Sequence, residues 1–275
     1  MRHIIFNLLD LSIKISCPSN YFLKKINKRY NGFIGKIESK PSFELDIKNP
    51  ISFRRRTNYY INKNTSNELR LEFNITKDYS SIKIDKKRNN GIYYTRKKDL
   101  YHFNLILPII IRILLNGNKG TGFHATSIIN NRKGYIFFGS SGSGKTTICK
   151  SLKKGIILHD DMTLIREING KFKVGSVPRK TLLKNICKKN KSAELKACFR
   201  IIKSNKNKLV KLSKKDALKL IKQATQDDTC AWQIDKYINT KKQSQVLSNL
   251  VKKVDIYDLY FRKKCDFWGL INEIK

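Results

Sequence analysis

Alternating apolar and polar residues dominate the first hundred positions and predict β-strands. In LRLEFNI, residues 69–75, the apolar side chains occupy every second position, which is the period of a strand with one buried face. The segments SIKID and GIYYTR follow, and the KKRNNG between them offers a turn at Asn90–Gly91. The N-terminal residues 1–17 also resemble a strand more than a signal peptide, because Asp10 and Lys14 interrupt their apolar patches.

The pattern changes after residue 100. FNLILPIIIRILL, residues 103–115, is the most apolar run; it is too short for a membrane span and predicts a buried helix. We expect NGNKGTG, residues 116–122, to be a flexible loop, and FHATSIINNRKGYIFFG to be a hairpin that turns within residues 130–134. The chain therefore divides into a β-rich region, residues 1–100, and a second domain, residues 101–275.

The hairpin leads directly into a glycine-rich loop, GSSGSGKT, which fits the pattern G-x-x-x-x-G-K-[ST] at every position. Glycines let backbone N–H groups converge on phosphate oxygens, the lysine reaches the β- and γ-phosphates, and the hydroxyl of Thr146 can bind Mg²⁺. We expect a short helix to follow, ended by Gly155. The candidate nucleotide-binding residues are Gly139, Ser140, Ser141, Gly142, Ser143, Gly144, Lys145, Thr146 and Thr147.

Downstream, the apolar segment IIL ends in His159, Asp160 and Asp161. Of two adjacent aspartates after a strand, one can hold Mg²⁺ while its neighbour accepts a proton from an attacking hydroxyl. The alternative is a solvated acidic turn, and the sequence does not decide which aspartate has which role. Upstream, His124 is either a structural or solvated histidine, or a group that orients an acceptor or shares a proton with an aspartate.

The stretch from FHATS to LHDDMTLI resembles the catalytic core of the HPr kinase/phosphorylase family, part of a wider group that includes the ATP-dependent phosphoenolpyruvate carboxykinases. His124, the loop 139–146 and the pair Asp160–Asp161 match the family's motifs one by one. The resemblance extends over residues 100–265 and is specific over residues 123–165. It implies an α/β fold with a mixed sheet around a P-loop kinase core, preceded here by a β-rich region unlike the family's own N-terminal domain.

The resemblance also implies an activity. ATP with Mg²⁺ would occupy the loop, and its γ-phosphoryl group would pass to a serine-like hydroxyl of a protein, a peptide or a small molecule. The catalytic residues would be His124, Lys145, Asp160 and Asp161, with Thr146 and Asp161 on the metal. Arg179 is either a second cation for the phosphates or a surface arginine. The chain has no clear counterpart of the family's C-terminal segment that reverses the reaction, so the acceptor and reversibility stay open.

Charge and cysteine content add two constraints. The chain has 275 residues and a net charge of +37, which is typical either of a nucleic-acid or membrane partner or of a Lys-, Asn- and Ile-rich background composition. We favour the background, and we interpret the run Arg54–Arg56 as a solvated basic segment rather than an anion site. The six cysteines include no C-x-x-C pair, which favours reduced thiols in a cytoplasmic protein without structural zinc.

Three functions therefore compete. The kinase is the favoured one, followed by a non-catalytic ATP-binding or regulatory module that kept the loop. A nucleic-acid-dependent ATPase, suggested by the charge, lacks any helicase-like motif, so we do not expect a nucleic-acid partner. We also expect no membrane span, and a homo-oligomer is left open.

Overall fold

The computed structural model describes residues 2–36, 40–49, 60–65, 67–75, 78–95, 100–152, 154–179, 183, 185–226, 238–262 and 267–274. The chain divides into two compact units. Unit 1 comprises Met1–Leu114 with Tyr237–Asn239, and unit 2 comprises Leu115–Lys236 with Thr240–Lys275. The expected mixture of helices with large mixed sheets is confirmed in both units.

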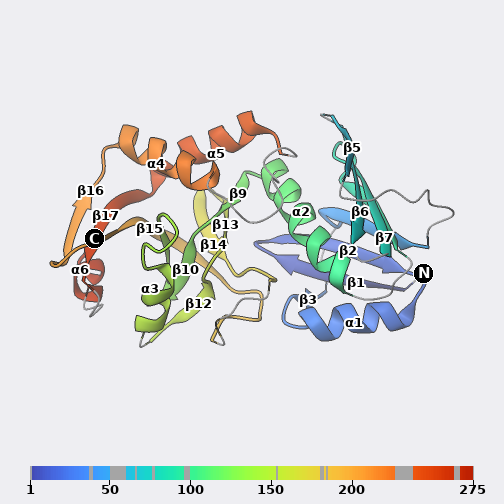
Figure 1. Cartoon of the computed structure of the whole chain (residues 1–275), viewed down its shortest axis with the longest axis horizontal. Coiled ribbons are helices and arrows are strands. Elements are labelled where there is room, and N and C mark those ends of the chain that lie inside the picture. The colour runs from blue at the N-terminus through green and yellow to red at the C-terminus, as the bar shows by residue number, and fades with distance from the viewer. Residues whose placement is uncertain are drawn as a thin grey trace. The chain divides into compact units, whose positions relative to one another are not determined.

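Unit 1 is built on an eight-stranded sheet in the order β3-β1-β2-β4-β8-β7-β6-β5 (Figure 1). Strand β4 runs parallel to both β2 and β8, and the other neighbours are antiparallel. Its elements are β1 (Arg2–Leu8), β2 (Leu11–Cys17), α1 (Asn20–Tyr30), β3 (Ile34–Gly35), β4 (Phe43–Lys48), β5 (Tyr60–Asn64), β6 (Glu68–Ile75), β7 (Asp78–Asp85), β8 (Asn90–Thr95) and α2 (Tyr101–Gly117), the last of which ends in unit 2.

The turn between β7 and β8 lies earlier than the sequence suggested. Asp85 and Asn90 are paired across the two strands, so residues 86–89 make the turn and Gly91 is part of β8. The carboxylate of Asp85 accepts hydrogen bonds from the N–H groups of Lys87 and Arg88, which is how an aspartate starts a turn. A Cβ on Gly91 would lie 3.2 Å from the ring of Phe43; the glycine therefore allows close packing within the sheet.

The expected buried helix is confirmed as α2, although it begins at Tyr101 and ends at Gly117. Phe103 packs edge-on against Phe22 and Tyr30 of α1, and the hydroxyl of Tyr30 donates to the side chain of Asn104. These contacts explain why most of α2 belongs to unit 1, with the division at Leu114/Leu115 rather than near residue 100.

Unit 2 contains a second mixed sheet, in the order β12-β10-β11-β15-β14-β13-β9. The long strand β15 runs parallel to β11 on one side, and on the other side it pairs first with β14 and then with β17, which in turn pairs with β16. The elements are β9 (Gly120–Phe123), β10 (Thr126–Asn130), β11 (Lys133–Phe138), α3 (Lys145–Ser151), β12 (Ile156–His159), β13 (Thr163–Ile168), β14 (Lys171–Gly175), β15 (Ser192–Lys203), β16 (Lys208–Lys211), α4 (Lys214–Gln226), α5 (Thr240–Lys253), β17 (Asp255–Phe261) and α6 (Trp268–Asn272).

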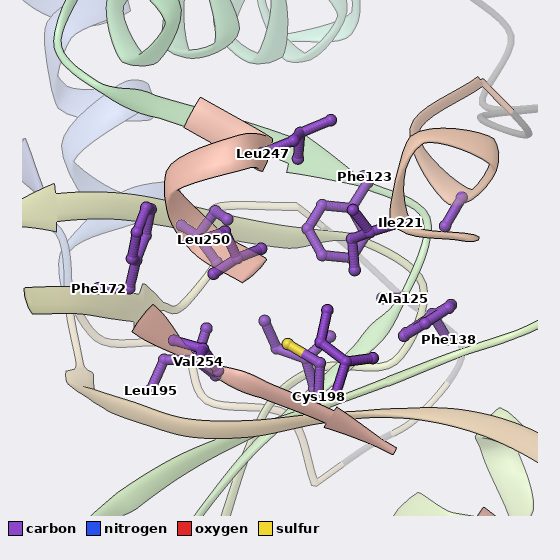
Figure 2. Packing of buried hydrophobic residues seen from close by; sticks show 14 of the residues in the cluster. Phe123, Ala125, Phe138, Phe172, Leu195, Cys198, Ile221, Leu247, Leu250 and Val254 are labelled. Atoms are coloured by element: carbon purple, nitrogen blue, oxygen red, sulfur yellow. The ribbon is translucent and has the colours of Figure 1, made fainter. Parts of the chain in front are cut away.

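Two hydrophobic clusters cover the two faces of this sheet. On one face, Ile221 of α4 and Leu247 and Leu250 of α5 pack against strand residues such as Phe123 and Phe138 (Figure 2). On the other face, Ile148 of α3 and Ile271 of α6 pack with apolar and aromatic side chains of β11, β15 and β17. In β15, Cys198 belongs to the first cluster and its neighbour Phe199 to the second. Successive side chains of a strand point to opposite faces, and here both faces are buried.

Two expectations about glycines were wrong. The predicted flexible loop 116–122 instead contains most of β9, whose residues are all buried. Gly120 and Gly122 lie too close to β13 for a side chain: a Cβ would lie 2.7 Å from the carbonyl oxygen of Ile165 in one case and 2.9 Å from Leu164 in the other. Helix α3 ends at Ser151, before Gly155; that glycine, with φ +124°, brings the chain against the carbonyl of Ile129.

Among the described residues, no helix is both long and apolar enough to cross a membrane, and no group of His, Cys, Asp and Glu is arranged to hold a metal by itself. Cys17, Cys149, Cys187 and Cys198 are free thiols. Arg54–Arg56 lie outside the described residues.

We predict that Gly120→Ala destabilises the protein by about 1–3 kcal/mol, because the new methyl group would press on the backbone of β13. Gly117→Ala is the matched control, since a Cβ there has no heavy atom within 4 Å; its stability should be unchanged or slightly raised. The free energy of unfolding from urea titrations measures both. Equal stability of the two variants would contradict the close strand packing.

Candidate functional site

The candidate site lies at one edge of the sheet in unit 2, where three chain segments converge. Strand β10 pairs antiparallel with β11 on one side and with β12 on the other, so β11 and β12 run in the same direction. The glycine loop follows β11, the aspartate pair follows β12, and His124 lies two residues before the start of β10. The start of β10 therefore meets the ends of its two neighbours, as the pairings Thr126↔Phe137 and Ser127↔His159 show.

A cavity of about 570 Å³ opens at this edge. The structure brings together in its lining most of the residues that the sequence singled out. The lining residues are His124, Ser141, Gly142, Gly144, Lys145, Thr146, Thr147, His159, Asp160, Asp161 and Arg179. Of the predicted loop residues, Gly139, Ser140 and Ser143 are not part of the lining and instead shape the loop.

The conformation of the loop depends on glycines with positive φ and on an aromatic ring that is far away in the sequence but close in space. Gly142 and Gly144 have φ values of +75° and +115°, which favour glycine. A Cβ on Gly144 would lie only 2.6 Å from the ring of Phe261, at the end of β17. Lys145 is 8% exposed, and its ammonium group donates to the carbonyl oxygens of Gly139 and Ser140 at 2.7 and 3.2 Å. The lysine thus lies along its own loop, at the cavity wall.

The two aspartates differ in their surroundings. The side chain of Asp160 is 12% exposed, and its Oδ1 is buried with no hydrogen-bond partner among the described atoms. Its carbonyl oxygen accepts a hydrogen bond from Thr126 of β10 at 2.8 Å. Asp160 therefore presents a poorly solvated carboxylate oxygen, the kind of group that a cation can satisfy.

Asp161 is more open, at 43% exposure, and lies between two basic side chains. Its Oδ1 lies 3.1 Å from Nδ1 of His124, although this contact does not have hydrogen-bond geometry. Its Oδ2 lies 3.9 Å from Nη1 of Arg179. The structure thus places both His124 and Arg179 beside the carboxylate of Asp161.

His159 is buried beneath the aspartates, at 1% exposure. Its Nδ1 accepts hydrogen bonds from the N–H groups of Asp161 and Met162, at 3.1 and 3.0 Å, so the proton of the neutral ring must lie on Nε2. Burial lowers the pKa of His159 to about 4, against the opposing effect of the Asp160 carboxylate. Although Asp160 Oδ1 lies 3.6 Å from Nδ1, the neutral ring makes no ion pair with it.

Cys149 connects α3 to this site. Burial raises the pKa of its thiol to about 12, with a smaller contribution from the Asp160 carboxylate and against the effect of a hydrogen bond with Thr126. The thiol is therefore protonated at neutral pH and is an inert packing group. Through these interactions of Cys149, helix α3 lies close to Thr126 and Asp160.

Sequence reasoning missed three contributors to the site. Thr126 lies only two residues after His124, and this closeness in the sequence was the only signal for it. His159 was visible as part of the IILHDD segment but was given no role. Phe261 is far from the loop in the sequence, and nothing local to it indicates the contact with Gly144.

Comparison with known proteins shows the family. The chain belongs to the family described as SynChlorMet cassette protein ScmC, whose model matches residues 94–275. A search of curated proteins finds no match. Among solved structures, the HPr(Ser) kinase/phosphatase from Coxiella burnetii is similar with a TM-score of 0.33 and 8% identity, over 55% of this chain and 97% of that chain. A TM-score this low does not define a shared fold, so the kinase resemblance of residues 123–165 stays a prediction.

The pKa of His159 predicts a specific dependence of stability on pH. Because its pKa is lower in the folded protein than the unfolded value of 6.5, the unfolded chain binds the proton more readily between pH 6.5 and about 4. The stability from this group is complete above pH 6.5 and is lost as the pH falls through that window, by up to about 3 kcal/mol.

The measurement is the free energy of unfolding of the wild type and of His159→Asn at several pH values from 7 to 4. The control variant removes this titration and retains the others, so the wild type should lose more stability than the variant. Parallel curves for the two proteins would contradict the buried neutral histidine.

Proposed function

We propose that this protein is an ATP-dependent kinase that transfers the γ-phosphoryl group to a hydroxyl of a protein, a peptide or a small molecule. The observation that carries the proposal is that residues of the phosphate-binding loop, Lys145 and Thr146 among them, line the same cavity as two adjacent aspartates. The resemblance to HPr kinases in residues 123–165 points in the same direction. The family description names a cassette protein and leaves the acceptor open.

The residues present fit ATP and Mg²⁺. Gly142 and Gly144 give the loop a conformation with its backbone uncovered, and any side chain at Gly144 would strike Phe261. Lys145 supplies an ammonium group beside the loop, and Thr146 supplies an exposed hydroxyl in the cavity lining. The sequence indicated Thr146 and Asp161 as metal ligands. The unpartnered Oδ1 of Asp160 is a third candidate.

Bound Mg²⁺–ATP would supply the phosphoryl group and the metal charge that stabilises it. Lys145 would exchange its bonds to the loop carbonyls for phosphate oxygens. The acceptor oxygen would form its bond to the γ-phosphorus as the bond from phosphorus to the β–γ bridging oxygen breaks and ADP leaves. A carboxylate of the aspartate pair would take the hydroxyl proton, with His124 within 3.1 Å of Asp161 to share it.

The arrangement also supports a positioning role for Arg179. Its guanidinium group lines the cavity and lies near Asp161, where it can orient the carboxylate and contact the transferred group. Phosphoryl transfer depends mainly on positioning and electrostatic stabilisation, so a site of this small size is sufficient.

We predict that Asp160→Asn and Asp161→Asn each lower phosphoryl transfer by at least about 100-fold, because each removes a carboxylate that serves proton or metal. At least one of the variants should retain wild-type ATP binding. The assay incubates purified protein with γ-labelled ATP and fractionated extract of its native cells, and counts labelled acceptor. Asp10→Asn, in the exposed turn between β1 and β2, is the control and should label normally.

The assay also separates the competing functions. Tight ATP binding by the wild type with no labelled acceptor in any fraction would favour the non-catalytic module. ATP turnover stimulated by DNA or RNA, with steep loss on adding salt, would favour the nucleic-acid-dependent ATPase.

Lys145→Met should weaken ATP binding about tenfold or more, since it removes a charged donor to the phosphates. Lys150→Met is the matched control: Lys150 lies on the same helix but is exposed and outside the cavity lining. Calorimetric titration with ATP measures both affinities. Equal affinities for the two variants would exclude the loop as the phosphate site.

A further inference from the structure

The turn that carries the two aspartates has an unusual acceptor. When an Asp or Asn starts a turn, its side-chain oxygen accepts N–H groups two and three residues further along. Here the same two positions, Asp161 and Met162, donate to Nδ1 of His159. The imidazole therefore occupies the place of an Asn side-chain oxygen, at the last residue of β12.

We propose that His159 is the positioning residue of the aspartate pair: its buried Nδ1 fixes the turn at residues 160–162 so that both carboxylates face the cavity. Two further bonds hold the turn from the other side. Thr126 donates to the carbonyl of Asp160, and Thr163 donates to the carbonyl of Ala125, at 2.8 and 3.1 Å. His159 supplies the acceptor for the N–H groups of Asp161 and Met162.

Burial makes this role specific to one ring nitrogen. His159 is 1% exposed, so in the folded wild type water does not compete with Nδ1 for these N–H groups. Both N–H groups of the turn donate to Nδ1, and the buried Nε2 accepts from neither. A substitute that keeps an acceptor at the Nδ1 position should preserve the turn, and one that moves it to the Nε2 position should not.

Asn and Gln make this distinction, because the side-chain oxygen of Asn can occupy the position of Nδ1 and that of Gln the position of Nε2. Ser and Ala form a second matched pair, differing by one hydroxyl that can accept in the same turn. The first readout is hydrogen exchange of the amides of Asp161 and Met162 in the full chain without nucleotide. We expect slow exchange in the wild type, His159→Asn and His159→Ser, and exchange at least about tenfold faster in His159→Gln and His159→Ala.

The second readout rests on the proposed function: the ratio of ATP affinities with and without Mg²⁺, measured by calorimetry. His159→Asn should keep the wild-type ratio, and His159→Gln should reduce the effect of Mg²⁺ about tenfold while leaving metal-free ATP binding unchanged. A general loss of structure would lower both affinities together.

Unprotected amides at residues 161 and 162 in the wild type would overturn the proposal, whatever the variants do. Equal exchange in the Asn and Gln variants would overturn it as well. If the wild type binds no ATP, the proposed function fails, and the exchange rates still decide the role of His159.

Discussion

The antiparallel pairing of β10 with both β11 and β12 is the constraint on which the candidate site depends. It forces the ends of β11 and β12 to the same sheet edge and places the start of β10 between them. The glycine loop, the acidic turn and His124 thereby line one cavity. The hydrogen bond from Thr126 to the carbonyl of Asp160 adds a direct link between two of the three segments.

The core of unit 2 supports this edge from both faces. Helices α4 and α5 cover one side, and α3 and α6 cover the other. Because β11 is bonded to β10 on one side and to β15 on the other, the strand before the loop lies in the interior of the sheet and cannot shift alone. The position of the loop is therefore stabilised by the packing of residues far from the cavity.

Much of this organisation could be predicted from the sequence. The hairpin at 126–138, the buried helix, the loop motif and the strand ending at the aspartates all follow from local periodicity and turn residues. The glycines at 120, 122 and 91 were misread, because the same residue serves both for flexible turns and for close contact between strands, and only the neighbouring strand distinguishes them. The contact of Phe261 with Gly144 could not be predicted, since it depends on the parallel alignment of β17 with β15.

The site combines groups of different electrostatic character in a small space. Lys145 and Arg179 bring positive charge, the aspartates bring negative charge, and His159 is kept neutral by burial beneath them. The net charge of the chain, +37, favours anionic molecules in general but selects none of them. Selectivity must therefore come from the cavity and its rim, where His124, Asp161 and Arg179 lie together.

The packing of Phe261 against Gly144 also has a consequence for the order of biosynthesis. The chain emerges from the ribosome with the glycine loop well before β17, so for much of translation the loop lacks the ring that supports it. Gly144 acquires its contact with this ring only when β17 has paired with β15. A ribosome-bound fragment that ends before this strand would thus carry every motif residue of the loop and still lack the ring of Phe261 beside Gly144.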